Sequence, residues 1–165
     1  MATDAEPVLI RRARGCEAPR LTAIAFAAKR HWEHPEEWIR AWASDLTITP
    51  DYVEKHEVPL ASSGGTAVAL VAVRQDDSES VAHLDHLWVS PSHMRRGIGA
   101  RLLDHAITRA REARATTLRI VSDPNAAGFY IRAGARRVGT EPSTPSGRFL
   151  PVLELGARHG RLHAP

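Results

Sequence analysis

Residues 84–103 decide the fold, and their sequence is LDHLWVSPSHMRRGIGARLL. They pass from an apolar strand pattern into an amphipathic helix through a short basic turn that holds Gly97 and Gly99. Glycines let the main chain come close to a ligand, and the first N–H groups of a helix have no partner inside the helix. Such donors bind anionic oxygens. The stretch therefore predicts a strand, a turn suited to a diphosphate, and a helix.

Hydrophobic periodicity and start signals predict the elements around this stretch. Helices are expected to start at Pro19, at Pro35, near Thr49–Asp51, at the glycine turn and at Pro124, where Asp123 would be the cap and Gly134 the end. Strands are expected at residues 8–10, from residue 58, and at 66–73, 81–89, 117–122, 135–139 and 149–155. Residues 66–73 are apolar without alternation, which indicates a central strand covered on both faces.

Length and composition predict one globular domain of residues 8–155, between a flexible segment 1–7 and a frayed tail 156–165. The single Cys16 excludes an internal disulfide, and the nine histidines show no recurring ligand spacing, so no metal site is expected. No secretory signal and no membrane-spanning run is visible in the sequence, so a cytoplasmic protein is expected. The net charge of +3 comes from arginines interleaved with acids, so nucleic acid is not an expected partner.

The order of elements resembles the GNAT superfamily of acyl-CoA-dependent N-acyltransferases over residues 8–155. The superfamily signature is Gln or Arg, two free positions, Gly, one free position, then Gly or Ala. It falls on residues 94–99, where Met94 departs from the first position. The resemblance implies an α/β fold of the α+β type, with a mixed, mostly antiparallel sheet of six to seven strands and about four flanking helices.

The resemblance also implies an activity and a site for the coenzyme. The reaction is acetyl transfer from acetyl-CoA to a primary amine of a small molecule or protein, by direct attack in a ternary complex, and a homodimer is possible. The strand before the turn would diverge from its neighbour and offer its main chain to the pantetheine arm. The implied coenzyme contacts are Leu87, Trp88, Val89, Met94, Arg95, Arg96, Gly97, Ile98, Gly99, Ala100 and Asn125.

Attack of an amine on a thioester needs a proton acceptor for the ammonium and a proton donor for the leaving sulfur. The resemblance gives the acceptor role to His83 or Asp85 and the donor role to Tyr130. Each residue also has a purely structural interpretation. His83 could be a hydrogen-bonded sheet residue, Asp85 the partner of an arginine, and Tyr130 a core aromatic. Strand alternation predicts which side chains share a face. His83 and Asp85 would lie with Leu87 and Val89, and His86 would lie with Leu84 and Trp88.

The acceptor amine would bind between the N-terminal helices and the loop before the last strand. Trp32, His34 and Trp38 are the candidates there, because aromatic rings can hold a cation or shield an amine. Core packing is the alternative for Trp38 and Trp42. Ser146 and Arg148 are within the same loop region, although spacing alone does not support a role. A non-catalytic acyl-CoA-binding module is the alternative function, since it needs the turn without the proton-transfer groups.

Overall fold

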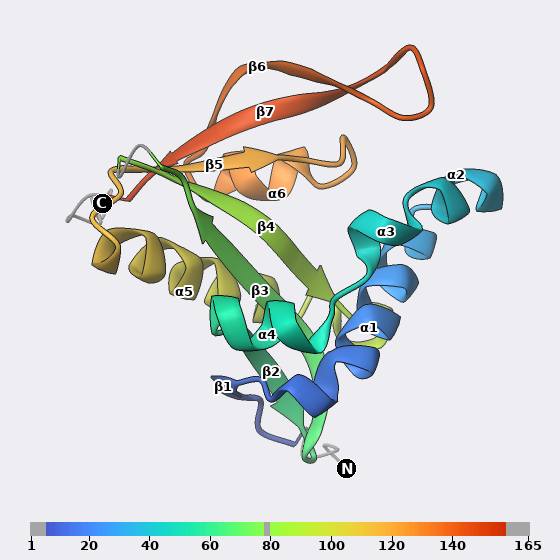
Figure 1. The fold of residues 1–165 in the computed structure, drawn as a ribbon, viewed down its shortest axis with the longest axis vertical. Coiled ribbons are helices and arrows are strands. Elements are labelled where there is room, and N and C mark those ends of the chain that lie inside the picture. Colours follow the sequence, from blue (N-terminus) through green and yellow to red (C-terminus); the bar gives the residue numbers. More distant parts are fainter. Residues whose placement is uncertain (1–5, 78–79, 158–165) are drawn as a thin grey trace.

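The computed structural model describes residues 6–77 and 80–157, which form a seven-stranded sheet in the order β1-β2-β3-β4-β5-β7-β6 (Figure 1). β4 and β5 are parallel, whereas every other neighbouring pair is antiparallel, which confirms the expected mixed sheet. The strands are β1 (Leu9–Arg12), β2 (Pro59–Ser63), β3 (Thr66–Gln75), β4 (Val81–Val89), β5 (Thr117–Val121), β6 (Arg136–Ser143) and β7 (Arg148–Gly156).

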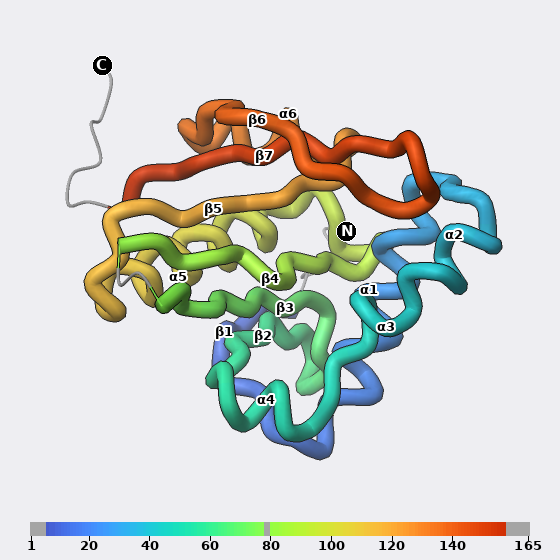
Figure 2. Tube along the Cα trace, turned by 45° about the horizontal axis from the view of Figure 1, so that its top comes forward, coloured from blue at the N-terminus to red at the C-terminus, as the bar shows by residue number. Residues whose placement is uncertain are grey.

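Helices cover both faces of the sheet (Figure 2). One face carries α5 (Ile98–Glu112) and α6 (Ala127–Arg132), whose apolar residues share one core cluster. The other face carries α1 (Ala18–His31), α2 (Glu36–Ala41), α3 (Ala43–Leu46) and α4 (Pro50–His56). About four helices were expected, and the described residues form six α-helices, of which only α1 and α5 exceed seven residues. None of the described helices is long and apolar enough to cross a membrane.

The apolar stripes predicted from the sequence form the two cores. Leu102, Leu103 and Ala106 of α5 are buried against the sheet, and Leu21 and Ile24 of α1 are buried on the opposite face. Six successive residues of β3, Ala67–Ala72, are also buried, which confirms that it is a central strand covered on both sides. The two cores hold β3 and β4 between α1 and α5.

β4 and β5 diverge after three residue pairs. Their register joins Val81, Ala82 and His83 to residues 117–119, and no β5 partner follows. Residues 84–89, called here the divergent segment, have a neighbouring strand, β3, on one side only. None of these residues is fully buried, in contrast to the neighbouring residues of β3. The expected widening is therefore present, and it leaves main-chain donors and acceptors free along one edge of β4.

The predicted alternation along β4 is wrong across Asp85, where the strand contains a β-bulge, although His86 and Trp88 share a face as predicted. Ala72 pairs with His86 and Val73 pairs with Leu84, so Asp85 has no register partner on β3. One extra residue in a strand shifts every following side chain to the other face. The α5 face receives Leu84, Leu87 and Val89, and the α1 and α4 face receives His83, Asp85, His86 and Trp88.

Two element boundaries also differ from the prediction. α6 begins at Ala127 instead of Pro124, because the Asp123 side chain accepts the Asn125 N–H at 3.0 Å and makes a turn of residues 124–126. β7 continues through Gly156, and Ala157 is buried. Of the predicted terminal segments, residues 1–5 and 158–165 lie outside the described residues.

Candidate active site

The turn before α5 presents unpaired main-chain donors to open space. Gly97 has φ +77° and Arg95 has φ +64°, and two left-handed residues so close together turn the chain sharply into the helix. The first helical bond runs from the Arg101 N–H to the Gly97 carbonyl at 3.2 Å, so the N–H groups of residues 98–100 precede any helical acceptor. A Cβ on Gly97 would meet no atom within 4 Å. The exposed Arg95 and Arg96 add positive charge, and the turn therefore fits a diphosphate.

Gly99 brings this turn against the divergent segment. A Cβ at Gly99 would lie 3.5 Å from the Phe129 ring and 3.8 Å from Val89 Cγ2, so α5, α6 and the end of β4 meet here. Leu87 and Val89 pack against the same core, whereas Trp88 points to the α1 face. The Asn125 amide donates to Asp123 Oδ1 at 3.0 Å, so its predicted contact with the coenzyme stays a prediction.

Tyr130 of α6 is 7% exposed and packs with the α5 core, in ring contact with Phe129. Its hydroxyl has no hydrogen-bond partner among the described residues. Every fully enclosed side-chain nitrogen or oxygen of those residues does have a partner, so the Tyr130 oxygen keeps some contact with solvent. Burial raises the pKa of Tyr130, which keeps the hydroxyl protonated. A largely buried O–H donor is thus left available to a ligand.

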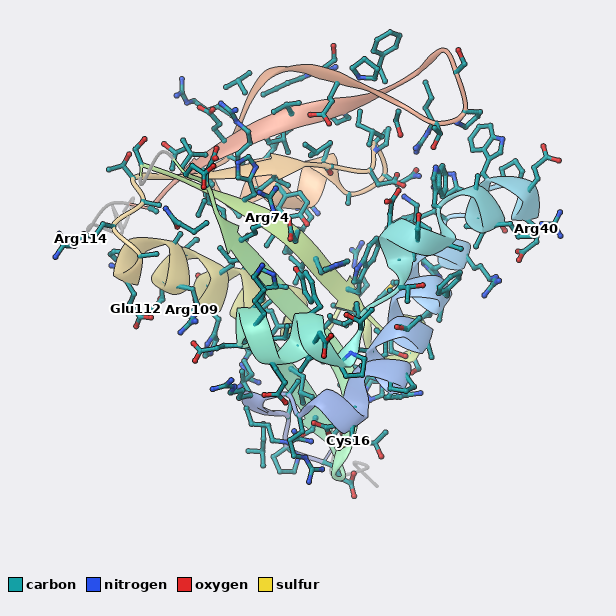
Figure 3. All side chains as sticks on the ribbon, in the orientation of Figure 1. Cys16, Arg40, Arg74, Arg109, Glu112 and Arg114 are labelled. Atoms are coloured by element: carbon teal, nitrogen blue, oxygen red, sulfur yellow. The ribbon has the colours of Figure 1, made fainter. Side chains whose placement is uncertain are left out.

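Asp85 is held in place from two elements. The Tyr52 hydroxyl of α4 donates to Asp85 Oδ2 at 2.9 Å, and Arg74 Nε of β3 donates to Oδ1 at 3.3 Å (Arg74 is labelled in Figure 3). Burial, followed by the charge of Asp85, raises the pKa of Tyr52, so Tyr52 remains a donor. The Asp85 side chain keeps 22% exposure, and each carboxylate oxygen has a further lone pair for a water or an amine.

His86 stands beside this carboxylate and was not predicted as a site residue. Burial lowers its pKa, so the imidazole is neutral near pH 7. Trp88 Nε1 donates to His86 Nδ1 at 3.0 Å, which leaves the single proton of the neutral ring on Nε2. His86 therefore presents a donor to its surroundings. The bulge at Asp85 places the consecutive side chains of Asp85 and His86 on the same face, and no local sequence signal revealed that bulge.

His83 lies at the paired end of β4. Its register partner on β5 is Arg119, and its ring nitrogen is 3.2 Å from the exposed Asp76 carboxylate. The divergent segment begins one residue later. The structure thus places Asp85 beside the divergence and His83 at the closed end, bonded to a loop residue.

A compact charged group lies where β5 ends, and we call it the Asp123 cluster: Lys29, His34, Asp123 and Arg148. Asp123 Oδ2 lies 2.6 Å from Lys29 Nζ, 2.9 Å from His34 Nε2 and 3.6 Å from Arg148 Nη2. The four side chains are only 8–14% exposed. Burial alone would raise the pKa of Asp123, but hydrogen bonds from Lys29, the Asn125 N–H and His34 outweigh it and lower the pKa to about 2.

Aromatic rings surround the Asp123 cluster. Lys29 Nζ lies 4.5 Å and the Arg148 guanidinium 4.8 Å from the centre of the Trp42 ring, and the guanidinium is also 5.8 Å from Trp38. Trp42 Nε1 donates to the carbonyl and hydroxyl of Thr144 at 3.0 Å each, which ties the β6–β7 loop to α2 and α3. The rings at this site therefore already hold the chain's own cations. Of the predicted acceptor residues, His34 is a member of the Asp123 cluster, and Trp38 lies against Arg148 of that cluster.

Trp32 makes no ring or ion contact with the Asp123 cluster, Trp38 or Trp42. It is 38% exposed, and its ring contacts His31. Within residues 6–77 and 80–157, no three histidine, cysteine or acidic side chains are placed to hold a metal ion. The free Cys16 is exposed.

The Asp123 cluster gives a first prediction about stability. Because the pKa of Asp123 lies below its ordinary 3.8, its ionised form stabilises the fold above about pH 4, and this contribution is lost as the pH falls toward 2. Asp123→Asn should cost about 2–4 kcal/mol in free energy of unfolding at pH 7, since it leaves Lys29 without a charged partner. Denaturant titrations of both proteins from pH 7 to pH 2 should show this difference shrinking below pH 4. A difference that stays constant over that range would contradict the assignment, and Asp51→Asn, at an exposed residue of α4, is the control.

Comparison with known proteins agrees with this geometry. The chain is 28% identical over 143 residues to the peptidyl-lysine N-acetyltransferase YjaB of Escherichia coli (strain K12), a match that covers 80% of this chain and 95% of that protein. The enzyme of the same name from Salmonella typhimurium is also 28% identical, with 80% of this chain and 97% of that protein covered.

Solved structures share the fold at lower identity. The PaiA N-acetyltransferase of Thermoplasma acidophilum in complex with coenzyme A has a TM-score of 0.72 and 17% identity, with 91% of this chain and 99% of that chain covered. The ribosomal-protein-S18-alanine N-acetyltransferase of Escherichia coli has a TM-score of 0.66 and 18% identity, with 96% and 99% covered. The model of the acetyltransferase (GNAT) family matches residues 15–135, which include the divergent segment, the turn before α5 and Tyr130. The chain therefore belongs to the GNAT family of N-acetyltransferases.

Proposed function

We propose that this enzyme transfers the acetyl group of acetyl-CoA to a primary amine while both substrates are bound. The observation that carries the proposal is the divergence of β4 from β5 directly before a helix start with open main-chain donors. A diphosphate held by residues 95–100 would direct the rest of the coenzyme along the free edge of the divergent segment. Acetyl-CoA supplies an acyl thioester at this place.

The residues around the divergence come from both faces of the sheet. Tyr130 packs on the α5 face, and Asp85 and His86 lie on the α1 and α4 face. A thioester between the two strands would have a hydroxyl donor on one side and a carboxylate on the other. The acceptor amine would then enter from the side of α1 and α2. This arrangement favours an enzyme over a module that only binds the coenzyme, because such a module needs neither group.

Asp85 is our choice for the proton acceptor. An alkyl ammonium with an ordinary pKa near 10 must lose a proton before its nitrogen can attack. Asp85 has lone pairs left after its bonds to Tyr52 and Arg74, whereas the acceptor nitrogen of His86 already receives the Trp88 N–H. Asp85 can take the proton directly or through one water molecule, and the proton then passes to solvent.

Tyr130 is our choice for the donor to the leaving group. When the C–N bond forms and the C–S bond breaks, nitrogen loses its second proton and sulfur gains one. A hydroxyl that stays protonated can donate a hydrogen bond to the sulfur while negative charge develops there. The net reaction yields an acetamide and a free thiol, and one proton goes to solvent.

The acceptor proposed from the relatives is a lysine side chain, because the two matched proteins are described as peptidyl-lysine N-acetyltransferases. The test is a panel of amines and lysine peptides incubated with acetyl-CoA, in which free thiol and acetylated product are measured together. Equal amounts of both would support the proposal. Saturable binding of acetyl-CoA without product from any amine would instead favour the non-catalytic module.

Replacement of the proposed base gives a second prediction. Asp85→Asn should lower kcat/KM for the amine by about 100-fold at pH 7.5, because the ammonium then loses its proton only to solvent. The deficit should narrow as the pH approaches the pKa of the free amine, since more of the substrate then arrives unprotonated. Rate profiles from pH 6.5 to 10 measure both effects. Asp51→Asn is the matched control, and an unchanged rate at pH 7.5 in Asp85→Asn would remove the role.

A further inference from the structure

The charges of the Asp123 cluster do not balance. The Lys29 ammonium and the Arg148 guanidinium face a single carboxylate, and the Asp123 oxygen nearest to Arg148 is the one already bonded to Lys29 and His34. No other acidic group of the described residues lies within ion-pair distance of Arg148. A surplus positive charge on side chains that are at most 14% exposed is unfavourable unless an anion neutralises it.

Arg148 is the unsatisfied member of the cluster. At 3.6 Å, its contact with Asp123 is an ion pair too long for a hydrogen bond. Its guanidinium makes no hydrogen bond with any described residue, and it is packed over the rings of Trp42 and Trp38. Since no fully enclosed nitrogen lacks a partner, these N–H groups reach solvent. Packing thus fixes a planar fork of donors whose edge is open, and such a fork matches a carboxylate.

The Asp123 cluster lies on the proposed acceptor side of the divergence. β4 and β5 run in parallel, so their carboxyl ends face the same way, and Asp123 follows the end of β5 as Ser90 follows the end of β4. Arg148 begins β7, whose residue Pro151 accepts a bond from Ser122 next to Asp123. Trp88 of the divergent segment packs in one cluster with Trp38 and Trp42. The open edge of Arg148 is therefore near the place where an acceptor amine would enter.

From this we infer that the acceptor is a small amine that also carries a carboxylate, and that Arg148 binds this carboxylate while Lys29 neutralises Asp123. The inference rests on the proposed acetyl transfer, and it assigns a free amino acid as the acceptor in place of the peptidyl-lysine that the relatives' names suggest. A recessed group with one open fork suits the single carboxylate of an amino acid better than an extended acidic surface. Arg148 is then a specificity residue that distinguishes amino acids from uncharged amines of the same shape.

Matched pairs of amines test the inference. The probes are L-lysine, L-methionine and β-alanine, each compared with its own carboxamide, which keeps the shape and removes the charge. For the unmodified enzyme we expect kcat/KM to be at least about ten-fold higher for the best acid than for its amide. In Arg148→Gln this ratio should fall to about one, through a higher KM for the acid, while kcat for the amide stays within about two-fold. Arg148→Lys should retain part of the preference, because it keeps the charge without the fork.

Arg137→Gln is the matched control, because Arg137 is an exposed arginine on β6 of the same hairpin. Thermal unfolding and acetyl-CoA titration of each variant show whether Arg148→Gln has kept its fold and its coenzyme site. Equal rates with acids and amides, or equal losses on both in Arg148→Gln, would overturn the inference. Lysine peptides with neutral flanks that react as well as the best amino acid would overturn it too. If no amine releases thiol, the proposed function itself fails, so the two failures are distinct.

Discussion

Gly97→Trp is expected to lower the affinity for acetyl-CoA by at least about 100-fold, or about 2.7 kcal/mol. A side chain at this position, the N-cap of α5, would start in open space, because apart from the chain neighbours no atom lies within 4 Å of the Cβ. An indole there would fill the place of the diphosphate, and no other group of the turn could replace the blocked main-chain donors. Calorimetric titration with acetyl-CoA measures the loss.

Backbone strain must be separated from this loss of space. Gly97 has φ +77°, where any residue with a Cβ pays about 1–2 kcal/mol. Gly97→Ala has the same strain without the indole, so it is the control at the same position. It should retain most of the affinity with a similar drop in thermal stability. If both variants bind acetyl-CoA as tightly as the unmodified protein, the diphosphate is not held at this turn.

The features predicted correctly from the sequence are those encoded locally. The apolar stripe of α5 and its glycine start lie within one continuous stretch, and the unbroken apolar run of β3 shows its central position directly. Local patterns of this kind survive folding because tertiary packing reinforces them. The strand, turn and helix that position the proposed coenzyme site could therefore be predicted.

The face of the sheet on which Asp85 and His86 lie could not be predicted in the same way, since it depends on one extra residue in β4. A sequence of alternating residues contains no mark of a bulge, and the bulge at Asp85 reverses the faces that simple alternation gives. The consequence is large. It places Asp85 against Tyr52 on the same face as His86, and it leaves Leu84, Leu87 and Val89 on the α5 face.

The Asp123 cluster is a second case, for a different reason. Its members come from α1, the loop after α1, the end of β5 and the start of β7, so their separation in sequence reaches 119 positions between Lys29 and Arg148. Charged residues at such distances carry no pairing signal in a single sequence. Once the sheet order brings β7 next to β5, the same four residues become one buried group.

The two faces of the site depend on each other through the divergence. The α5 face holds the diphosphate turn and Tyr130, and the α1 face holds Asp85 and the Asp123 cluster. A sheet paired along its whole length would separate them, because ladder hydrogen bonds would close the edge of β4. The end of β4–β5 pairing at His83 is thus the structural condition for the proposed reaction.

Tyr130→Phe is expected to lower kcat by about 100- to 1,000-fold and to leave the affinity for acetyl-CoA unchanged. The change removes one oxygen that has no hydrogen-bond partner among the described residues, so the free energy of unfolding should move by no more than about 0.5 kcal/mol. A large loss of turnover in an equally stable protein then points to a role in the reaction. Steady-state rates, coenzyme titration and thermal unfolding are the three measurements.

The leaving group distinguishes a proton donor from a residue that merely shapes the site. If Tyr130 donates to the departing sulfur, its removal should matter much less with the selenoester analogue of acetyl-CoA, because a selenolate leaves readily without a proton. A residue needed only to position the thioester would instead slow both substrates to the same extent, since both have the same shape. Equal losses with the thioester and the selenoester would therefore exclude the donor role, even if Tyr130→Phe is nearly inactive.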